Sequence, residues 1–143
     1  MDRQSRLAGR RRVAELTRRS IHVEGLSHQN PIPVASRVGN VVASSVISAV
    51  DPETGQTPDT LEAQCDAVFS NMRLILTAAG ATTYDVVRVG VYMEDPTQRA
   101  AMNRFWLEMF PDESDRPARH TQQESLPGSG LIAADFIAVI DDD

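Results

Sequence analysis

The sequence contains no lysine, because all fourteen basic residues among its 143 are arginines. A covalent imine between a lysine side chain and a substrate, or pyridoxal phosphate, is therefore excluded. An anionic ligand must instead be held by arginine, histidine or backbone N–H groups. The planar guanidinium of arginine suits a carboxylate, which it binds through two parallel hydrogen bonds.

Cysteine is almost absent. The single residue, Cys65, excludes an intrachain disulfide and favours a cytoplasmic location. Cysteine and histidine show no metal-ligand spacing, so we expect neither a metal site nor a cofactor. No apolar run reaches the roughly 18 residues of a membrane span. No apolar segment follows the basic start either, so we expect no signal peptide and no membrane partner.

Positive charge is scarce outside the N-terminus. Residues 1–20 carry seven arginines against two acids, whereas residues 21–143 carry seven arginines against eighteen acids. We therefore predict a basic N-terminal arm at 1–20 and a single domain at 21–143. The acidic domain argues against nucleic acid as a main partner. The arm is interpreted as a solvated extension, with RNA, an acidic partner or a neighbouring subunit as alternatives.

Apolar periodicity predicts an α+β fold in the order β-β-α-β-α-β-β. Runs rich in β-branched residues predict strands at 21–23, 39–48, 85–93, 118–124 and 131–140. The segment 28–35 contains two prolines and predicts an extended loop.

Two helices are expected between these strands. A one-face pattern begins at Asp59 or Thr60, where Asp59 and Glu62 resemble a capping box, and it ends at Gly80. Cys65 falls on the buried stripe, which indicates a core role. The second helix opens at Asp95–Pro96 and ends before the breaker at 111–117.

Both helices are expected on one face of a single mixed sheet. The strands VVASSVIS and LIAADFIAVI carry apolar residues at both odd and even positions, which is typical of strands buried on both faces. The chain offers no third layer for the second face. Other copies of the chain in a closed cyclic oligomer would cover it, and sites between copies would then be lined by two chains.

Several separated motifs together resemble the Rid family (YjgF-like reactive intermediate deaminases). They are NVVASSVISAVDPETGQTP, LTAAG, DVVRVGVYMED, MNRFWLEMF, RPARH and LPGSGLIAADFIAV, and they span roughly residues 30–140. The resemblance implies a chorismate-mutase-like fold. It also implies a homotrimer whose sheets meet in a central barrel, with a ligand cleft at each subunit interface.

The resemblance assigns Arg119 a specific role. It occupies the arginine position of the family's Pro-Ala-Arg motif, which pairs with the carboxylate of a 2-imino or enamine acid. Such acids are hydrolysed to 2-keto acids and ammonia. Backbone groups at 119–121 would bind the nitrogen or the developing charge. The alternative is that Arg119 forms only an interface ion pair.

Other matched positions imply a substrate-binding wall. Asn103 and Trp106 match cleft residues, although a surface or core role is the alternative for each. Ser45 matches a cleft serine. The Gly-Gln that commonly follows it is replaced here by Val46-Ile47, so the wall is altered.

The last strand departs from the family pattern. Active members carry Glu-x-Glu, and the first glutamate, which positions the attacking water, falls at Ala133 here. Alanine cannot orient or deprotonate water. Asp135, on the same side of the strand as Ala133, is one candidate replacement. His120 is another, but it should point to the face opposite Arg119 unless a bulge turns it. Glu124 is a weaker option.

Three functions follow from these observations. The leading prediction is a hydrolytic deaminase of an imine or enamine carboxylic acid, with a longer enamine dicarboxylate of the 2-aminomuconate type as a variant. The absent glutamate favours the alternative of a non-catalytic carboxylate-binding trimer that acts as a sensor or regulator. A ribonuclease or translation inhibitor is disfavoured by the acidic domain and supported only by the arm.

Overall fold

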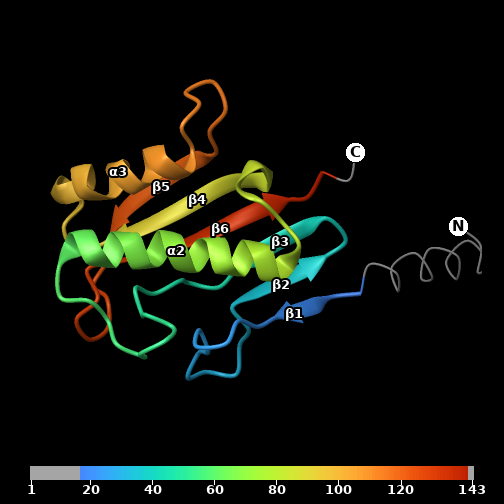
Figure 1. Ribbon diagram of the computed structural model, residues 1–143, viewed down its shortest axis with the longest axis horizontal. Coiled ribbons are helices and arrows are strands. Elements are labelled where there is room, and N and C mark those ends of the chain that lie inside the picture. The colour runs from blue at the N-terminus through green and yellow to red at the C-terminus, as the bar shows by residue number, and fades with distance from the viewer. Residues whose placement is uncertain (1–16, 142–143) are drawn as a thin grey trace, which may run out of the picture.

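The computed structural model describes residues 17–141, which form one six-stranded sheet with two helices packed on one side (Figure 1). The strand order is β1-β2-β3-β6-β4-β5, with β4 and β5 parallel and every other pair antiparallel. The strands are β1 (Arg19–Ile21), β2 (Ala35–Val38), β3 (Val41–Ser44), β4 (Val86–Met93), β5 (Ala118–Gln123) and β6 (Ile132–Val139). The predicted α+β class and the single mixed sheet are therefore confirmed.

The first half of the sheet corrects two strand predictions. The strand predicted at 39–48 ends at Ser44, and only Ile47 pairs further on, in an isolated bridge with Ala134. An additional strand, β2, pairs with β3 through a tight turn in which Gly39 has φ +56°. The prolines just before β2 concealed it in the sequence, because proline reads as a loop signal.

The strand predicted at 21–23 lies two residues earlier, so Arg19 and Ser20 belong to β1. These two residues had been assigned to the basic arm. The arm's residues 1–16 lie outside the described part of the chain. The predicted boundary between arm and domain therefore remains a prediction.

Local signals at the helix ends mostly match the sequence. α2 (Leu61–Ala79) is capped by Thr60, whose hydroxyl accepts a hydrogen bond from the Ala63 N–H, so the cap predicted at Asp59 is wrong. Gly80 ends the helix in the left-handed region at φ +79°. Pro96 opens a short 3₁₀ turn, η2 (Pro96–Gln98), before α3 (Arg99–Met109). Neither α-helix in residues 17–141 is long and apolar enough to cross a membrane.

The core lies between the helices and the side of the sheet that they cover, which we call the helix-covered face. Val42, Val89, Val91 and Phe136 point into it from three strands and are at most 1% exposed. Cys65 packs there from α2, and burial, with a smaller contribution from Glu62, raises the pKa of its thiol to about 11. A neutral buried thiol is a poor nucleophile, which agrees with the predicted core role.

The opposite side, the open face, carries exposed apolar side chains. Val38, Val41 and Val139 are in register across three neighbouring strands and are 43–49% exposed. Ile137 adds to them at 41%. We call these four residues the apolar patch. No other element among residues 17–141 covers it, as expected from strands that are apolar at both parities (Figure 1).

Candidate functional site

Arg119 lies on β5 and reaches under α3 on the helix-covered face. Its Nη1 donates to Asn103 Oδ1 at 2.8 Å and also contacts Met102 Sδ at 3.3 Å. Its guanidinium carbon lies 4.8 Å from the centre of the Trp106 ring. Asn103 and Trp106 are three residues apart and thus share a face of α3. The structure therefore brings together three of the residues predicted for substrate binding.

The charge of Arg119 is not neutralised within the described chain. No carboxylate among residues 17–141 forms an ion pair with it, and Asn103 supplies only a neutral acceptor. Partial burial, and then repulsion by Arg99, lower the pKa of its guanidinium. Arginine nevertheless stays protonated at any physiological pH. A partly desolvated, oriented cation with free N–H groups can bind a carboxylate through two hydrogen bonds.

Thr121 adds a polar group that sequence reasoning missed. It lies two residues after Arg119 and therefore on the same side of β5. Its hydroxyl is buried and has no hydrogen-bond partner among residues 17–141. The alternation of β5 was the signal that could have revealed it.

His120, Asp135 and Ala133 lie on the open face, away from Arg119. The β4–β5 pairing is regular, and His120 and Asp135 are both register partners of Gly90, from opposite sides. Ala133 is the register partner of Tyr92 and is 4% exposed. His120 therefore points away from Arg119, as the strand alternation predicts. A single chain does not assemble the predicted catalytic residues in one place.

Asp135 belongs to a polar cluster on the open face. The Tyr92 hydroxyl donates to Asp135 Oδ2 at 2.6 Å, and Arg88 Nη1 lies 3.9 Å from Oδ1. The hydrogen bond to Asp135, with smaller contributions from desolvation and the carboxylate charge, raises the pKa of Tyr92 to about 12. Sequence reasoning missed Tyr92 and Gly90, although a glycine inside an apolar strand is a signal of close approach.

Ser45 and Val46 follow β3 at a third location. Ser45 Oγ donates to the Pro33 carbonyl at 2.8 Å, which ties this segment to the loop before β2. Val46 is 50% exposed and lines a cleft of about 360 Å³ with Ile47 and His28. Neither residue contacts the Arg119 group in one chain.

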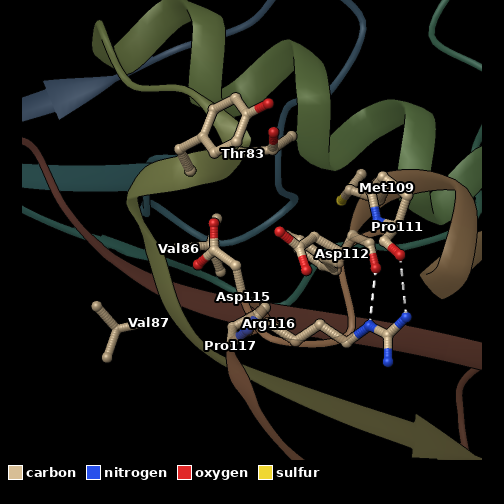
Figure 2. A pocket seen from close by; sticks show the side chains of 11 residues that line it. Thr83, Val86, Val87, Met109, Pro111, Asp112, Asp115, Arg116 and Pro117 are labelled. Carbon is tan, nitrogen blue, oxygen red and sulfur yellow. Dashed lines mark hydrogen bonds between the residues drawn. The ribbon is translucent and has the colours of Figure 1, made fainter.

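A second cavity, of about 310 Å³, lies at the C-terminal end of α3 (Figure 2). Arg116 crosses its edge and donates to the carbonyls of Phe110 and Pro111 at 2.8 and 3.2 Å. Asp112 and Asp115 also line it, but none of the predicted site residues does. Within residues 17–141, no cluster of three or more histidine, cysteine, aspartate or glutamate side chains could hold a metal ion.

Comparison with known proteins supports the motif-based resemblance. The family model described as Endoribonuclease L-PSP matches residues 28–140. A RutC family protein of Pyrococcus abyssi is 36% identical over 110 residues, which cover 76% of this chain and 85% of that protein. The 2-iminobutanoate/2-iminopropanoate deaminase of Escherichia coli is 30% identical over 104 residues, covering 71% and 81%.

Solved structures agree on the fold. The crystal structure of RidA from an Antarctic Psychrobacter species superimposes with a TM-score of 0.79 at 29% identity, covering 85% of this chain and 99% of that one. Strands β2 to β6, the apolar patch and the Ala-Arg of the Pro-Ala-Arg motif at the start of β5 all lie inside the matched residues. The chain therefore belongs to the Endoribonuclease L-PSP family, which is the Rid family indicated by its motifs.

Proposed function

We propose that the protein is a hydrolytic deaminase that converts an imine or enamine carboxylic acid to a 2-keto acid and ammonia. The observation that carries the proposal is the Arg119 guanidinium, which is oriented by Asn103 and Trp106 but paired with no carboxylate within residues 17–141. The names of relatives point the same way, since one is a 2-iminobutanoate/2-iminopropanoate deaminase.

Arg119 would hold the substrate carboxylate and fix the imine carbon for attack. The Asn103 oxygen occupies Nη1, so Nε and Nη2 remain to face the two carboxylate oxygens. Trp106 packs against the guanidinium and limits its rotation. The buried hydroxyl of Thr121 lies on the same side and would bind a polar group of the substrate, such as the imine nitrogen. Because binding already fixes the orientation of the substrate, the entropy cost of that orientation does not add to the barrier of the reaction step.

The proposal requires an oligomer, and we propose a homotrimer. Arg119 and the Asp135 cluster occupy opposite faces of one sheet, so one chain cannot present both to a single substrate. The exposed apolar patch supports association through the open face. A closed ring would place the open face of one copy beside the Arg119 edge of the next, giving a site lined by two chains. Ser45, Val46 and Ala133 would then have substrate-wall roles.

A longer enamine dicarboxylate, of the 2-aminomuconate type, is a second candidate substrate. The supporting observation is Arg99, which is exposed at the start of α3 and close enough to lower the pKa of Arg119. No carboxylate among residues 17–141 forms an ion pair with Arg99. Arg99, Asn103 and Trp106 share one stripe of α3, so two cations border the same site. A substrate with a second carboxylate would be attracted by both guanidinium groups and would bind between them.

Two further readings remain distinct from a deaminase. A carboxylate-binding trimer without turnover would keep Arg119 and need no activated water. An endoribonuclease, the activity that the family model's description names, would need a cationic surface, whereas residues 21–143 carry eighteen acids against seven arginines. The cytoplasmic location inferred from the single cysteine remains a prediction.

The deciding experiment is imine hydrolysis. An amino-acid oxidase would generate 2-iminobutanoate or 2-iminopropanoate in the presence of semicarbazide, which competes for the imine. We expect the full-length protein to divert imine to the keto acid and Arg119→Ala to lose this effect. Arg73→Ala, at an exposed arginine on α2, is the matched control. Binding of keto acids without any hydrolysis would contradict the deaminase and leave the carboxylate-binding protein.

A further inference from the structure

Tyr92 and Asp135 form an oriented acid–base pair on the open face. This pair takes no part in the carboxylate binding proposed for Arg119. The phenol donates to Oδ2 of Asp135 at 2.6 Å. Oδ1 accepts no hydrogen bond from residues 17–141, and the Arg88 guanidinium lies 3.9 Å away, which exceeds hydrogen-bonding distance. The Asp135 side chain is 24% exposed. One carboxylate oxygen is thus fixed, and the other is free to accept a hydrogen bond from a solvent molecule.

Gly90 is the residue that permits this arrangement. A Cβ at position 90 would lie 2.4 Å from Asp135 Oδ1 and 3.1 Å from the Tyr92 hydroxyl oxygen. Any other residue would displace the carboxylate. Glycine in the middle of a strand is destabilising, so its presence in β4 is not explained by strand stability. The backbone at Gly90 instead forms a floor beneath Oδ1 and the phenol.

His120 also lies on the open face, across Gly90 from Asp135, but it lacks the same support. It is the register partner of Gly90 from β5, and its side chain is exposed. No hydrogen bond orients its imidazole among residues 17–141, whereas Asp135 is held by Tyr92. A group that positions water must itself be positioned. The geometry therefore favours Asp135 over His120 for this step.

We propose that Asp135 holds and deprotonates the attacking water and that Tyr92 is its positioning residue. This inference rests on the proposed imine hydrolysis and on an oligomer that presents the open face to a carboxylate bound by a neighbouring Arg119. It assigns the step to the carboxylate of Asp135, two positions after Ala133. Ala133 itself is the cross-strand neighbour of Tyr92.

The step balances with one water molecule. The water oxygen forms a bond to the imine carbon, and the C=N π electrons move to nitrogen. Asp135 accepts a proton from the water and returns it to that nitrogen, which gives a carbinolamine. Asp135, again a carboxylate, then takes the proton of the carbinolamine hydroxyl and passes it to the amine nitrogen. The C–N bond breaks, ammonia leaves, the C=O bond of the 2-keto acid forms, and Asp135 ends the cycle as a carboxylate. Tyr92 keeps its proton throughout, since its pKa is raised to about 12.

The test compares substitutions that keep the fold. Asp135→Asn keeps an oxygen to accept the Tyr92 hydrogen bond but removes the base. We expect it to lower kcat for 2-iminobutanoate hydrolysis about 100-fold or more, because positioned acid–base groups typically contribute 10²–10⁴-fold. Tyr92→Phe should lower kcat on the order of tenfold with KM nearly unchanged, because the carboxylate remains but is no longer oriented.

Two controls complete the experiment. Tyr84→Phe removes the other tyrosine hydroxyl, at a residue that is 87% exposed, and should keep wild-type kcat. His120→Gln should retain most of the activity. Because a loss of folded enzyme would also lower the apparent kcat at an unchanged KM, the double variant is the discriminating readout. Tyr92→Phe should lower kcat about tenfold in the wild-type background and cause no further loss in the Asp135→Asn background, whereas a merely structural role would lower kcat in both.

The possible outcomes separate this inference from the proposed function. Active wild type with active Asp135→Asn overturns the water-positioning role and leaves the deaminase intact. Active wild type with inactive His120→Gln and active Asp135→Asn assigns the step to His120 and also overturns it. Wild type that is inactive on 2-iminobutanoate, 2-iminopropanoate and an enamine dicarboxylate overturns both proposals together.

Discussion

On the helix-covered face, Arg119 lies beneath α3 and pairs with no carboxylate of residues 17–141, whereas on the open face Asp135 lies over Gly90 and accepts a hydrogen bond from Tyr92. Successive residues of a strand point to opposite faces, so β5 places Arg119 and His120 on different sides. The cation and the carboxylate are thus separated by the thickness of one sheet. Each face alone has half of what imine hydrolysis needs, and association of copies is the means by which the halves would meet.

The largest expected effect comes from disrupting the proposed oligomer. Ile137→Asp places a charge in the apolar patch, on a side chain that is 41% exposed and therefore not needed for the core of one chain. We expect a folded monomer by light scattering and a loss of imine hydrolysis of at least about 100-fold, because the second half of the site is removed.

The matched control for this prediction is Leu74→Asp on α2, where the side chain is 43% exposed but lies on a helix away from the apolar patch. It should keep both the oligomer and the activity. A monomeric Ile137→Asp protein with full activity would show that one chain contains the entire site, and the comparison between the two faces would lose its functional meaning.

The next effect sharpens the role of the helix-covered face. Arg119→Lys keeps a positive charge but loses the planar pair of donors, so we expect kcat/KM to fall on the order of tenfold to 100-fold. Steady-state kinetics of imine hydrolysis measures it, with Arg73→Lys as the control. Wild-type kinetics from Arg119→Lys would mean that only charge matters, and that bidentate recognition is wrong.

A smaller effect is expected from the residue that orients Arg119. Asn103→Ala removes the acceptor at 2.8 Å and leaves the guanidinium supported by Trp106 and Met102. The loss of one hydrogen bond to a charged group predicts a roughly tenfold higher dissociation constant for a 2-keto acid. Calorimetry of 2-ketobutyrate binding measures this change. Tighter binding would indicate that Asn103 competes with the ligand for Arg119.

The smallest expected effect is a change in the pKa of Tyr92 on the open face, which is measured without an activity assay. In a Tyr84→Phe background, Tyr92 is the only tyrosine, and its ultraviolet absorbance should titrate near pH 12. Because the pKa is raised in the folded state, the hydrogen bond stabilises the fold fully below about pH 10 and is lost as the pH rises towards 12. Asp135→Asn should lower the midpoint towards about 10. An unchanged midpoint would contradict the Tyr92–Asp135 pair.

Much of the fold could be predicted because local signals agreed with it. The Gly80 stop, the Pro96 turn and the buried stripe through Cys65 all depend on neighbours a few residues away. The strand β2 was missed because its identity depends on pairing with β3, while its own sequence follows two prolines. Likewise, Asp59 and Thr60 are both good capping residues, so the pattern could not show that the helix begins at Leu61 with Thr60 as its cap.

The candidate site divides in the same way. Strand alternation alone placed Arg119 and His120 on opposite faces, and the motifs alone selected Arg119, Asn103 and Trp106. The mid-strand glycine at position 90 signals a close approach, but neither it nor Tyr92 could be matched to Asp135, because these contacts join strands that are more than forty residues apart. A hydrogen bond of this kind depends on sheet register, which a sequence pattern constrains only to the correct face.

The sequence by itself determined the fold class and the apolar nature of both sheet faces, since composition and periodicity act residue by residue, and the motif resemblance selected Arg119. The tertiary structure alone decided which groups touch. It placed Asn103 against Arg119, and it gave Asp135 a tyrosine partner above a glycine floor. The physical reason is that burial follows from local pattern, whereas a contact between distant side chains requires the register of the whole sheet.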